Sequence, residues 1–176
     1  MWQSIADVLD HLSELVGKTV AWLVLLLVGI IVYDVSMRYL FLWGSVALQE
    51  LEWHLFALIF LLAAAYTLKH DEHVRVDIFY SSRRLTDYHR AWIDFLGTLL
   101  FLTPFCVLII YSSTPFVVNA FQFGEGSPDP GGLPYRFLLK LTIPVGFALL
   151  LLQGIANGLR ALMTITRHHV KATGDS

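Results

Sequence analysis

A few ionisable side chains stand inside otherwise apolar stretches of the sequence, and their spacing could support chemistry. Asp34 and Arg38 are four residues apart, with the acid toward the N-terminus, which is the favourable order for an ion pair on one helical face. Isolated charge in apolar surroundings is costly and is usually paired. The pattern favours a structural clamp, in which Arg38 pairs with Asp34 or reaches Glu50 or Glu52, over a charge that faces a substrate.

Glu50 and His54 also share one helical face, and Glu52 points elsewhere. Such a pair could form a proton relay or half of a metal site. A metal ion needs three or four converging ligands, however, and no other histidine or cysteine is expected at that depth. Acids that pair with Arg38 or bind a partner protein are the favoured interpretation.

The seven histidines raise the hypothesis of a haem-binding membrane anchor. Such a site needs two histidines at matching depth on facing helices. Only His54 falls in a long apolar stretch, and the others lie in polar segments: His11, His70, His73, His89, His168 and His169. The sequence also lacks a glycine-flanked serine nucleophile, a pair of metal-binding histidines spaced as in metalloproteases and a phosphate-binding glycine loop. We therefore expect neither an enzyme nor a bound cofactor.

The last apolar stretch carries a pattern typical of close helix packing. Gly154 and Gly158 are four residues apart, beside Gln153 and Asn157. Small residues let two helix backbones approach, and amides form hydrogen bonds between helices where water does not compete. The partner helix could belong to this chain or to another subunit.

The composition shows which class of protein positions these residues. Of the 176 residues, 56% are hydrophobic and only 15% are charged, which is outside the usual range for a soluble domain. The mean hydropathy is +0.64. The net charge of -2, with basic residues scattered along the chain, leaves no basic stripe for a nucleic-acid backbone. The composition thus indicates a protein of the lipid bilayer and excludes nucleic-acid binding.

Four stretches are long and apolar enough to cross a membrane. Roughly 20 apolar residues in a helix span a hydrocarbon core about 30 Å thick. The sequence predicts transmembrane helices at residues 18–38, 50–68, 91–118 and 137–162. Since lipid offers no partner for a free backbone amide, these stretches must be helical. The prediction is an all-α membrane protein with a single domain, connected by polar segments at 69–90 and 119–136.

Residues 1–17 show a different pattern. Apolar residues recur every three or four positions, and Asp7, Asp10 and Glu14 lie on the other side. The acids argue against a signal peptide, which would open with positive charge. We expect a separate amphipathic helix that lies along the membrane surface or docks on a partner protein.

Lysine and arginine are unevenly distributed around the four stretches, which predicts an orientation. Five of these residues fall in the 69–90 connection, Lys18 stands at the start of the first stretch, and three lie toward the end of the chain: Arg160, Arg167 and Lys171. The opposite side has only Arg38, Arg136 and Lys140. Positive residues in short loops are retained on the cytoplasmic side. Both termini and the 69–90 connection are therefore expected in the cytoplasm, with 119–136 on the outer side. The chain shows no pair of matching inverted halves, which is the usual sign of a complete secondary transporter, so it calls for a larger translocating partner.

Several short motifs, in this order and spacing, resemble one transporter family. Arg38, Tyr39 and Phe41 are similar to its RYxF motif, and Glu50 to the glutamate that opens its second span. Residues 73–77 are similar to its HVxVD motif and are followed by a basic turn at 83–85. The chain resembles the small, DctQ-like membrane subunit of the tripartite ATP-independent periplasmic (TRAP) transporters over nearly its whole length.

The resemblance implies a function and a set of partners. The chain would brace a large, DctM-like membrane subunit that holds the sodium and substrate sites, while a periplasmic solute-binding protein delivers the solute. It would lie in a bacterial inner membrane and hold no cofactor of its own. Segment 127–136, followed by Lys140, Pro144 and Gln153, looks like the branch associated with organic acids such as 2-oxo acids or with mannitol and chloroaromatic compounds.

The resemblance also assigns structural roles to the residues that match its motifs. Arg38, Glu50 and Glu52 would hold the outer ends of the first two spans, and His73, Arg75 and Asp77 would order the cytoplasmic turn. Two other functions stay open at this point: a membrane anchor for a redox enzyme, and a free-standing small transporter.

Overall fold

A computed structural model describes residues 2–70 and 85–174 of the chain, in which every regular element is a helix. The elements, in chain order, are α1 Trp2–Phe41, α2 Val46–Lys69, α4 Asp87–Gly97, the π-helical turn η1 Thr98–Leu102, α5 Thr103–Gln122 and α6 Phe137–Gly174. Four helical stretches are long and apolar enough to span a membrane, because α4, η1 and α5 run on as one helix over Asp87–Gln122. The prediction of an all-α membrane protein with four transmembrane helices is confirmed.

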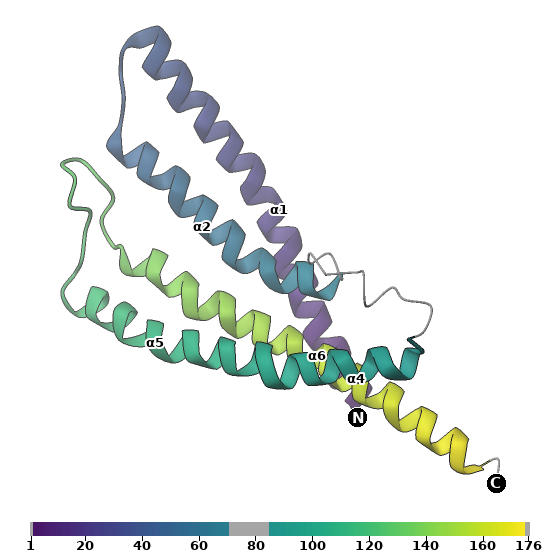
Figure 1. Cartoon of the computed structure of the whole chain (residues 1–176). Helices are drawn as coiled ribbons and strands as arrows, with labels where there is room; N and C mark the ends of the chain where they lie inside the picture. Colours follow the sequence, from purple (N-terminus) through teal and green to yellow (C-terminus); the bar gives the residue numbers. More distant parts are fainter. Residues whose placement is uncertain (1, 71–84, 175–176) are drawn as a thin grey trace.

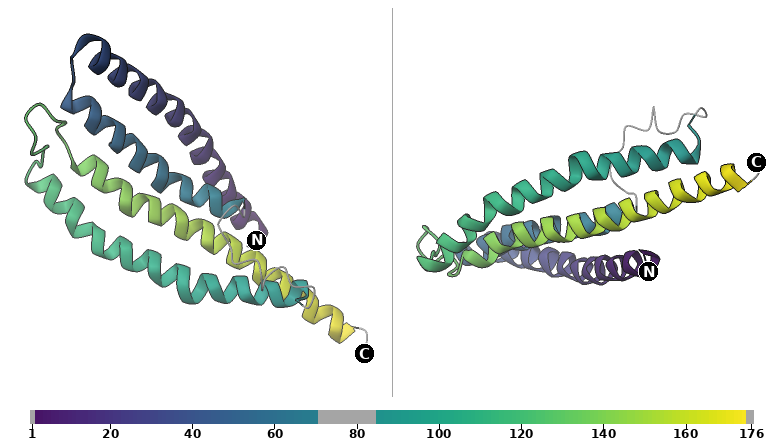
Figure 2. Two further views of the ribbon diagram at one scale, coloured as in Figure 1. Left: turned by 45° about the horizontal axis from the view of Figure 1, so that its top comes forward. Right: turned by 90° about the horizontal axis from the view of Figure 1, so that it is seen from below.

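The four spans form an open layer rather than a closed bundle. They lie side by side in the order α1, α2, α6, α5, and they fan apart toward the end that carries the α1–α2 and α5–α6 connections (Figure 1). Further views again place α1 and α5 on opposite sides of α2 and α6 (Figure 2). Two helices are therefore central in the layer, and two form its edges.

The separate amphipathic helix predicted for residues 1–17 is wrong. Residues 2–17 form the first turns of α1, which continues without a break to Phe41 and is apolar over most of its length. Gly17 does not interrupt the helix: it lies where the ring of Tyr66 on α2 packs so closely that a Cβ would fall 2.1 Å from the ring Cδ2. The acids of this segment contact basic side chains of α2 and α6, which holds the segment on the layer.

The third span contains a local widening at η1. Thr103 donates its backbone N–H to the carbonyl of Thr98, five residues earlier, as in a π-helix. Pro104 follows directly and has no N–H to donate to the carbonyl four residues before it. The wider turn lies against α6 at Gly154, where an added Cβ would come 2.4 Å from Leu102 Cδ2.

The central pair, α2 and α6, is in closest contact near the middle of the layer. A Cβ at Gly146 would lie 2.8 Å from the backbone carbonyl oxygen of Leu61. Such backbone proximity is characteristic of membrane helices that pack through small residues. It brings the C-terminal end of α2 beside the middle of α6, where the polar residues described next lie.

Candidate functional site: a polar network joining three helices

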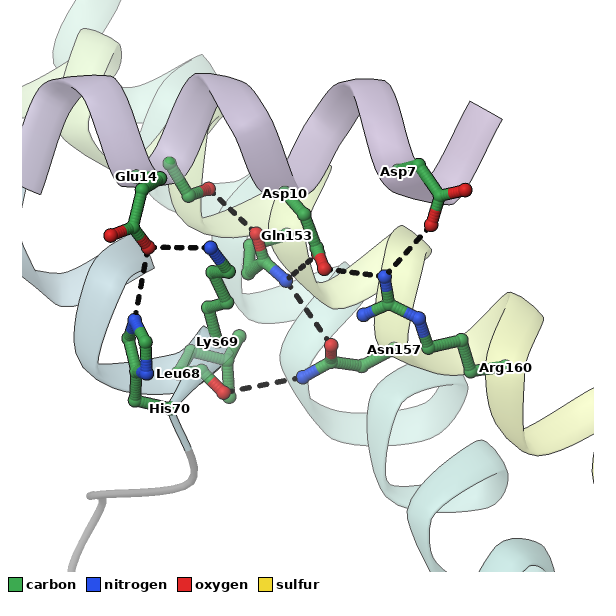
Figure 3. A network of polar contacts seen from close by, with 10 residues as sticks. Asp7, Asp10, Glu14, Leu68, Lys69, His70, Gln153, Asn157 and Arg160 are labelled. Atoms are coloured by element: carbon green, nitrogen blue, oxygen red, sulfur yellow. Dashed lines mark hydrogen bonds and ion pairs between the residues drawn. The ribbon is translucent and has the colours of Figure 1, made fainter. Parts of the chain in front are cut away.

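Asp10, near the start of α1, forms the centre of a polar network with α6 (Figure 3). Arg160 donates to one oxygen of the Asp10 carboxylate, and Gln153 Nε2 donates to the other at 2.9 Å. The guanidinium also lies 3.6 Å from the carboxylate of Asp7. Both oxygens of Asp10 are therefore satisfied by side chains of a helix more than a hundred residues away in the sequence.

Gln153 is fully buried and connects three polar partners. Its Oε1 accepts a hydrogen bond of 2.6 Å from Ser13, while Nε2 donates to Asp10 and, at 3.2 Å, to Asn157 Oδ1. A buried amide without partners would cost about 1–3 kcal/mol, so this arrangement stabilises one particular register between α1 and α6. The same register sets the position of α2.

Asn157 extends the network to the end of α2. Its Nδ2 donates to the carbonyl of Leu68 at 3.3 Å, one of the last carbonyls of that helix. Carbonyls at a helix C-terminus have no donor within the helix. Asn157 supplies one from α6.

Glu14 forms the second half of the same network. Its carboxylate accepts from Lys69 Nζ at 2.6 Å and lies 3.1 Å from His70 Nε2, and Lys18 is 3.4 Å away. Lys69 and His70 stand at the C-terminus of α2, where positive charge is favourable. The acidic face of the N-terminal third of α1 is thus neutralised by α2 through Glu14 and by α6 through Asp10.

The arrangement of these groups suits a structural latch. Each named polar group in it is directed at another protein group, and the part of the chain that the structure describes contains no cluster of three or more candidate metal ligands. That the chain holds no cofactor stays a prediction. The network fixes three helices at one end of the layer and leaves the far end to other contacts.

The glycines of the predicted packing motif face a different helix from the amides. Gln153 and Asn157 contact α1 and α2, whereas Gly154 packs against Leu102 of the third span. At Gly158 an added Cβ would meet Thr98 Cγ2 at an ordinary 3.5 Å. The motif is thus satisfied within this chain, with two faces that serve two neighbours.

Asp34 and Arg38 form an ion pair on α1, and Arg38 makes no ion pair with Glu50 or Glu52 in the described residues. Asp34 is buried, and its Oδ1 has no hydrogen-bond partner among the groups that the structure describes. The Arg38 side chain is 46% exposed. The pair is half buried in the layer and half available at its surface.

Glu50 is buried near the start of α2 and holds the connection between α5 and α6. Its carboxylate accepts hydrogen bonds from the Ser127 hydroxyl and, at 2.6 Å, from the Leu133 N–H. The His54 ring does not complete a relay with the Glu50 carboxylate, because its Nδ1 lies 2.5 Å from the backbone carbonyl of Glu50. Glu50 therefore fixes the far end of the layer through the loop.

The remaining predicted residues are less defined. One carboxylate oxygen of Glu52 is buried and has no hydrogen-bond partner in the described part of the chain. His73, Arg75 and Asp77 lie outside the described residues. Their roles stay predictions.

Sequence reasoning missed the residues that complete both ends of the layer. Asp10, Ser13 and Arg160 were not singled out as partners, nor was Ser127. A usable signal existed for the first group: the acids of residues 1–17 share one face, and basic residues stand at the corresponding ends of the second and fourth spans. No comparable periodicity exists for Ser127, which lies in an irregular loop.

Comparison of the sequence with known proteins identifies its family. A search of curated proteins found no match. The family profile described as the DctQ component of the tripartite ATP-independent periplasmic transporters matches residues 27–164, which include Gln153, Asn157 and Arg160 of the network and both ends of the Glu50 contact. The match covers most of the chain and agrees with the resemblance seen in its motifs. This four-span membrane protein therefore belongs to the DctQ family, a component of the tripartite ATP-independent periplasmic transporters.

Proposed function

We propose that this small permease subunit braces a large, DctM-like membrane subunit during sodium-coupled uptake of an organic acid or similar solute that a periplasmic binding protein delivers. The carrying observation is the polar network, because its groups are used to hold α1, α2 and α6 together and not to face a solute. A fixed layer of helices suits a subunit that stays still while another moves. In this proposal, the sodium and substrate sites lie in the large subunit.

The proposed orientation follows from the distribution of lysine and arginine. The latch end of the layer, with both termini, faces the cytoplasm of a bacterium, and the loop held by Glu50 faces the periplasm. The Glu50 carboxylate holds that loop through the Ser127 hydroxyl and the Leu133 N–H, so the loop offers the binding protein a preformed surface. Both membrane subunits of the proposed complex lie in the inner membrane.

Roles follow for the polar residues outside the network. Arg38 and Glu52, at the outer ends of α1 and α2, are proposed as contacts to the large subunit. His73, Arg75 and Asp77 are proposed to order the cytoplasmic connection. Gln153, Gly154, Asn157 and Gly158 act within the chain.

Reconstitution tests this function directly. Liposomes that contain the large subunit with this chain should take up solute when given a sodium gradient and loaded binding protein, and liposomes that contain either membrane subunit alone should not. Uptake by this chain alone would contradict the proposal.

A variant tests the role of Arg38 in the same system. Arg38→Ala should reduce the amount of large subunit recovered with the tagged chain and leave the sodium dependence of the remaining uptake unchanged. Normal assembly with an altered sodium dependence would refute the role of Arg38.

A further inference from the structure

One face of α5 carries polar groups toward the outside of the layer. Tyr111, Thr114, Pro115, Val118 and Asn119 recur at helical spacing and are all exposed, which defines the free face of α5. Because α5 packs on α6 at the edge of the layer, no other helix of the described chain covers this face (Figures 1 and 2). In a membrane, either lipid or another protein must cover it.

Tyr111 on this face lies within the hydrocarbon core. It is 78% exposed and is eleven residues from Gln122, the last residue of α5, or about 16 Å along a helix. Counted from residue 118, the end of the predicted transmembrane stretch, the distance is about 10 Å, so the phenol lies inside the hydrocarbon core by either boundary. Side chains of a helix lean toward its N-terminus, so the phenol leans away from the nearer end of α5. It is badly placed to reach water there.

Tyr111 also presents a backbone acceptor with no ordinary donor. Pro115 has no N–H for the carbonyl four residues earlier, which is that of Tyr111. The two neighbouring hydroxyls do not replace it, since Ser113 and Thr114 both donate to the carbonyl of Ile110, Thr114 at 2.7 Å. The phenol of Tyr111 has no hydrogen-bond partner within the described residues. Lipid tails can satisfy none of these groups.

The opposite edge of the layer, on α1, is different. Its exposed residues include Trp22, Leu25, Val28 and Val32, and the nearby Ser36 hydroxyl donates to its own helix at 2.7 Å. Tyr33 and Tyr39 carry the exposed phenols of α1; they are 48% and 79% exposed, and no proline follows either of them within four residues. The α5 edge thus presents a mid-helix carbonyl freed by a proline, and the α1 edge, which contains no proline, does not.

We propose that the free face of α5 is the surface on which a transmembrane helix of the large subunit packs, with a polar group of that helix bonded to Tyr111. This inference rests on the proposed function. The partner supplies an acceptor for the phenol or a donor for the freed carbonyl. Inside the membrane, water does not compete for either hydrogen bond. Thr114 and Pro115, both compact, let the two helices approach closely.

Photo-crosslinking in the intact complex tests the position of the partner. The photoreactive residue p-benzoylphenylalanine replaces Tyr111 or Val118 on the free face of α5, and Tyr33 or Leu25 on the α1 edge as controls. Co-purification of the large subunit with the unmodified chain is measured first, because its absence refutes the proposed function itself. Given that complex, adducts with the large subunit from 111 and 118, and none from 25 and 33, are expected.

The other outcomes overturn the inference while the proposed function stands. These are adducts with a second copy of this chain, adducts with lipid only at 111 and 118, or adducts with the large subunit only from the α1 edge. A second measurement isolates the hydrogen bond: Tyr111→Phe should lower the amount of co-purified large subunit by roughly three- to tenfold, and Tyr33→Phe should leave it unchanged. Equal effects of the two variants would refute the role of Tyr111.

Discussion

The guanidinium of Arg160 on α6 donates to the carboxylate of Asp10 on α1, and the two residues are 150 positions apart in the sequence. The Asp10 side chain is mostly buried, and that of Arg160 is partly exposed. Loss of one partner leaves the other charge in a poorly hydrated place, which costs more than loss of a pair on an open surface.

Removal of the Arg160 charge should weaken the attachment of the N-terminal third of α1. Arg160→Gln is expected to destabilise the isolated chain by about 1–2 kcal/mol, since a hydrogen bond to a charged group is lost while Asp10 keeps only Gln153. Thermal unfolding in mild detergent measures this. Lys18→Gln is the matched control, because Lys18 is 72% exposed and 3.4 Å from Glu14. Equal shifts for the two variants would show that the Asp10 pair is not part of the latch.

Gln153→Leu should have a larger effect than any single charge change in the network. The substitution removes the hydrogen-bond partner of three groups: the Ser13 hydroxyl, one carboxylate oxygen of Asp10 and the side-chain Oδ1 of Asn157. Each buried group left unsatisfied lowers the free energy of unfolding by about 1–3 kcal/mol. The exposed Gln49 on α2 provides the control, as Gln49→Leu. Unfolding midpoints in detergent decide the comparison. An unchanged midpoint for Gln153→Leu would mean that the buried amide fixes no register.

Gly146, Gly154 and Gly158 of α6 should respond differently to alanine. Gly146→Ala places a Cβ 2.8 Å from a backbone oxygen of Leu61, so α2 and α6 must separate, at a cost of about 1–3 kcal/mol. Gly154→Ala meets only the far end of Leu102 and should cost less. Gly158→Ala has room and should stabilise α6 by up to about 1 kcal/mol, because alanine favours helix. Equal behaviour of all three in thermal unfolding would contradict the packing described.

Glu50→Ala should loosen the loop between α5 and α6 without unfolding the spans. The Leu133 N–H loses its acceptor, so its hydrogen exchange should accelerate by roughly tenfold, while amides inside α2 keep their protection. Asp129→Asn is the control, because the exposed Asp129 side chain lies in the same loop. Unchanged exchange at Leu133 in the Glu50 variant would exclude the proposed support of the loop by Glu50.

The number and type of spans could be predicted from the sequence because lipid imposes a length and forbids unpaired backbone groups. The intrahelical pairing of Asp34 with Arg38 was one of two expected arrangements, since spacing of four residues brings side chains together whatever the tertiary structure. Local rules were sufficient for both.

The contacts between helices could not be predicted in the same way. Glu50 was considered as a partner for Arg38, which is near in sequence, yet it bonds Ser127, 77 positions away in an irregular loop. The acids of residues 1–17 were read as the polar face of a surface helix, because pattern alone cannot distinguish a face that meets water from one that meets Lys69 and Arg160. Which residues come into contact depends on the order of the helices in the layer. That order cannot be predicted from the local patterns of a single sequence.

The open layer has a mechanical consequence. A sheet of material one unit thick resists shear in its own plane but bends easily out of it, because bending stiffness rises steeply with thickness. Here the polar network of α1, α2 and α6 at one end, and the contact of Glu50 with the α5–α6 loop at the other, oppose sliding of neighbouring helices. At the latch end α1 also meets α6 directly, which opposes flexure there, whereas the fanned end of the described layer is held against bending mainly by whatever is packed on its broad faces. The described contacts therefore fix the order of the helices in the plane of the layer, and further resistance to bowing has to come from a neighbouring protein or from lipid.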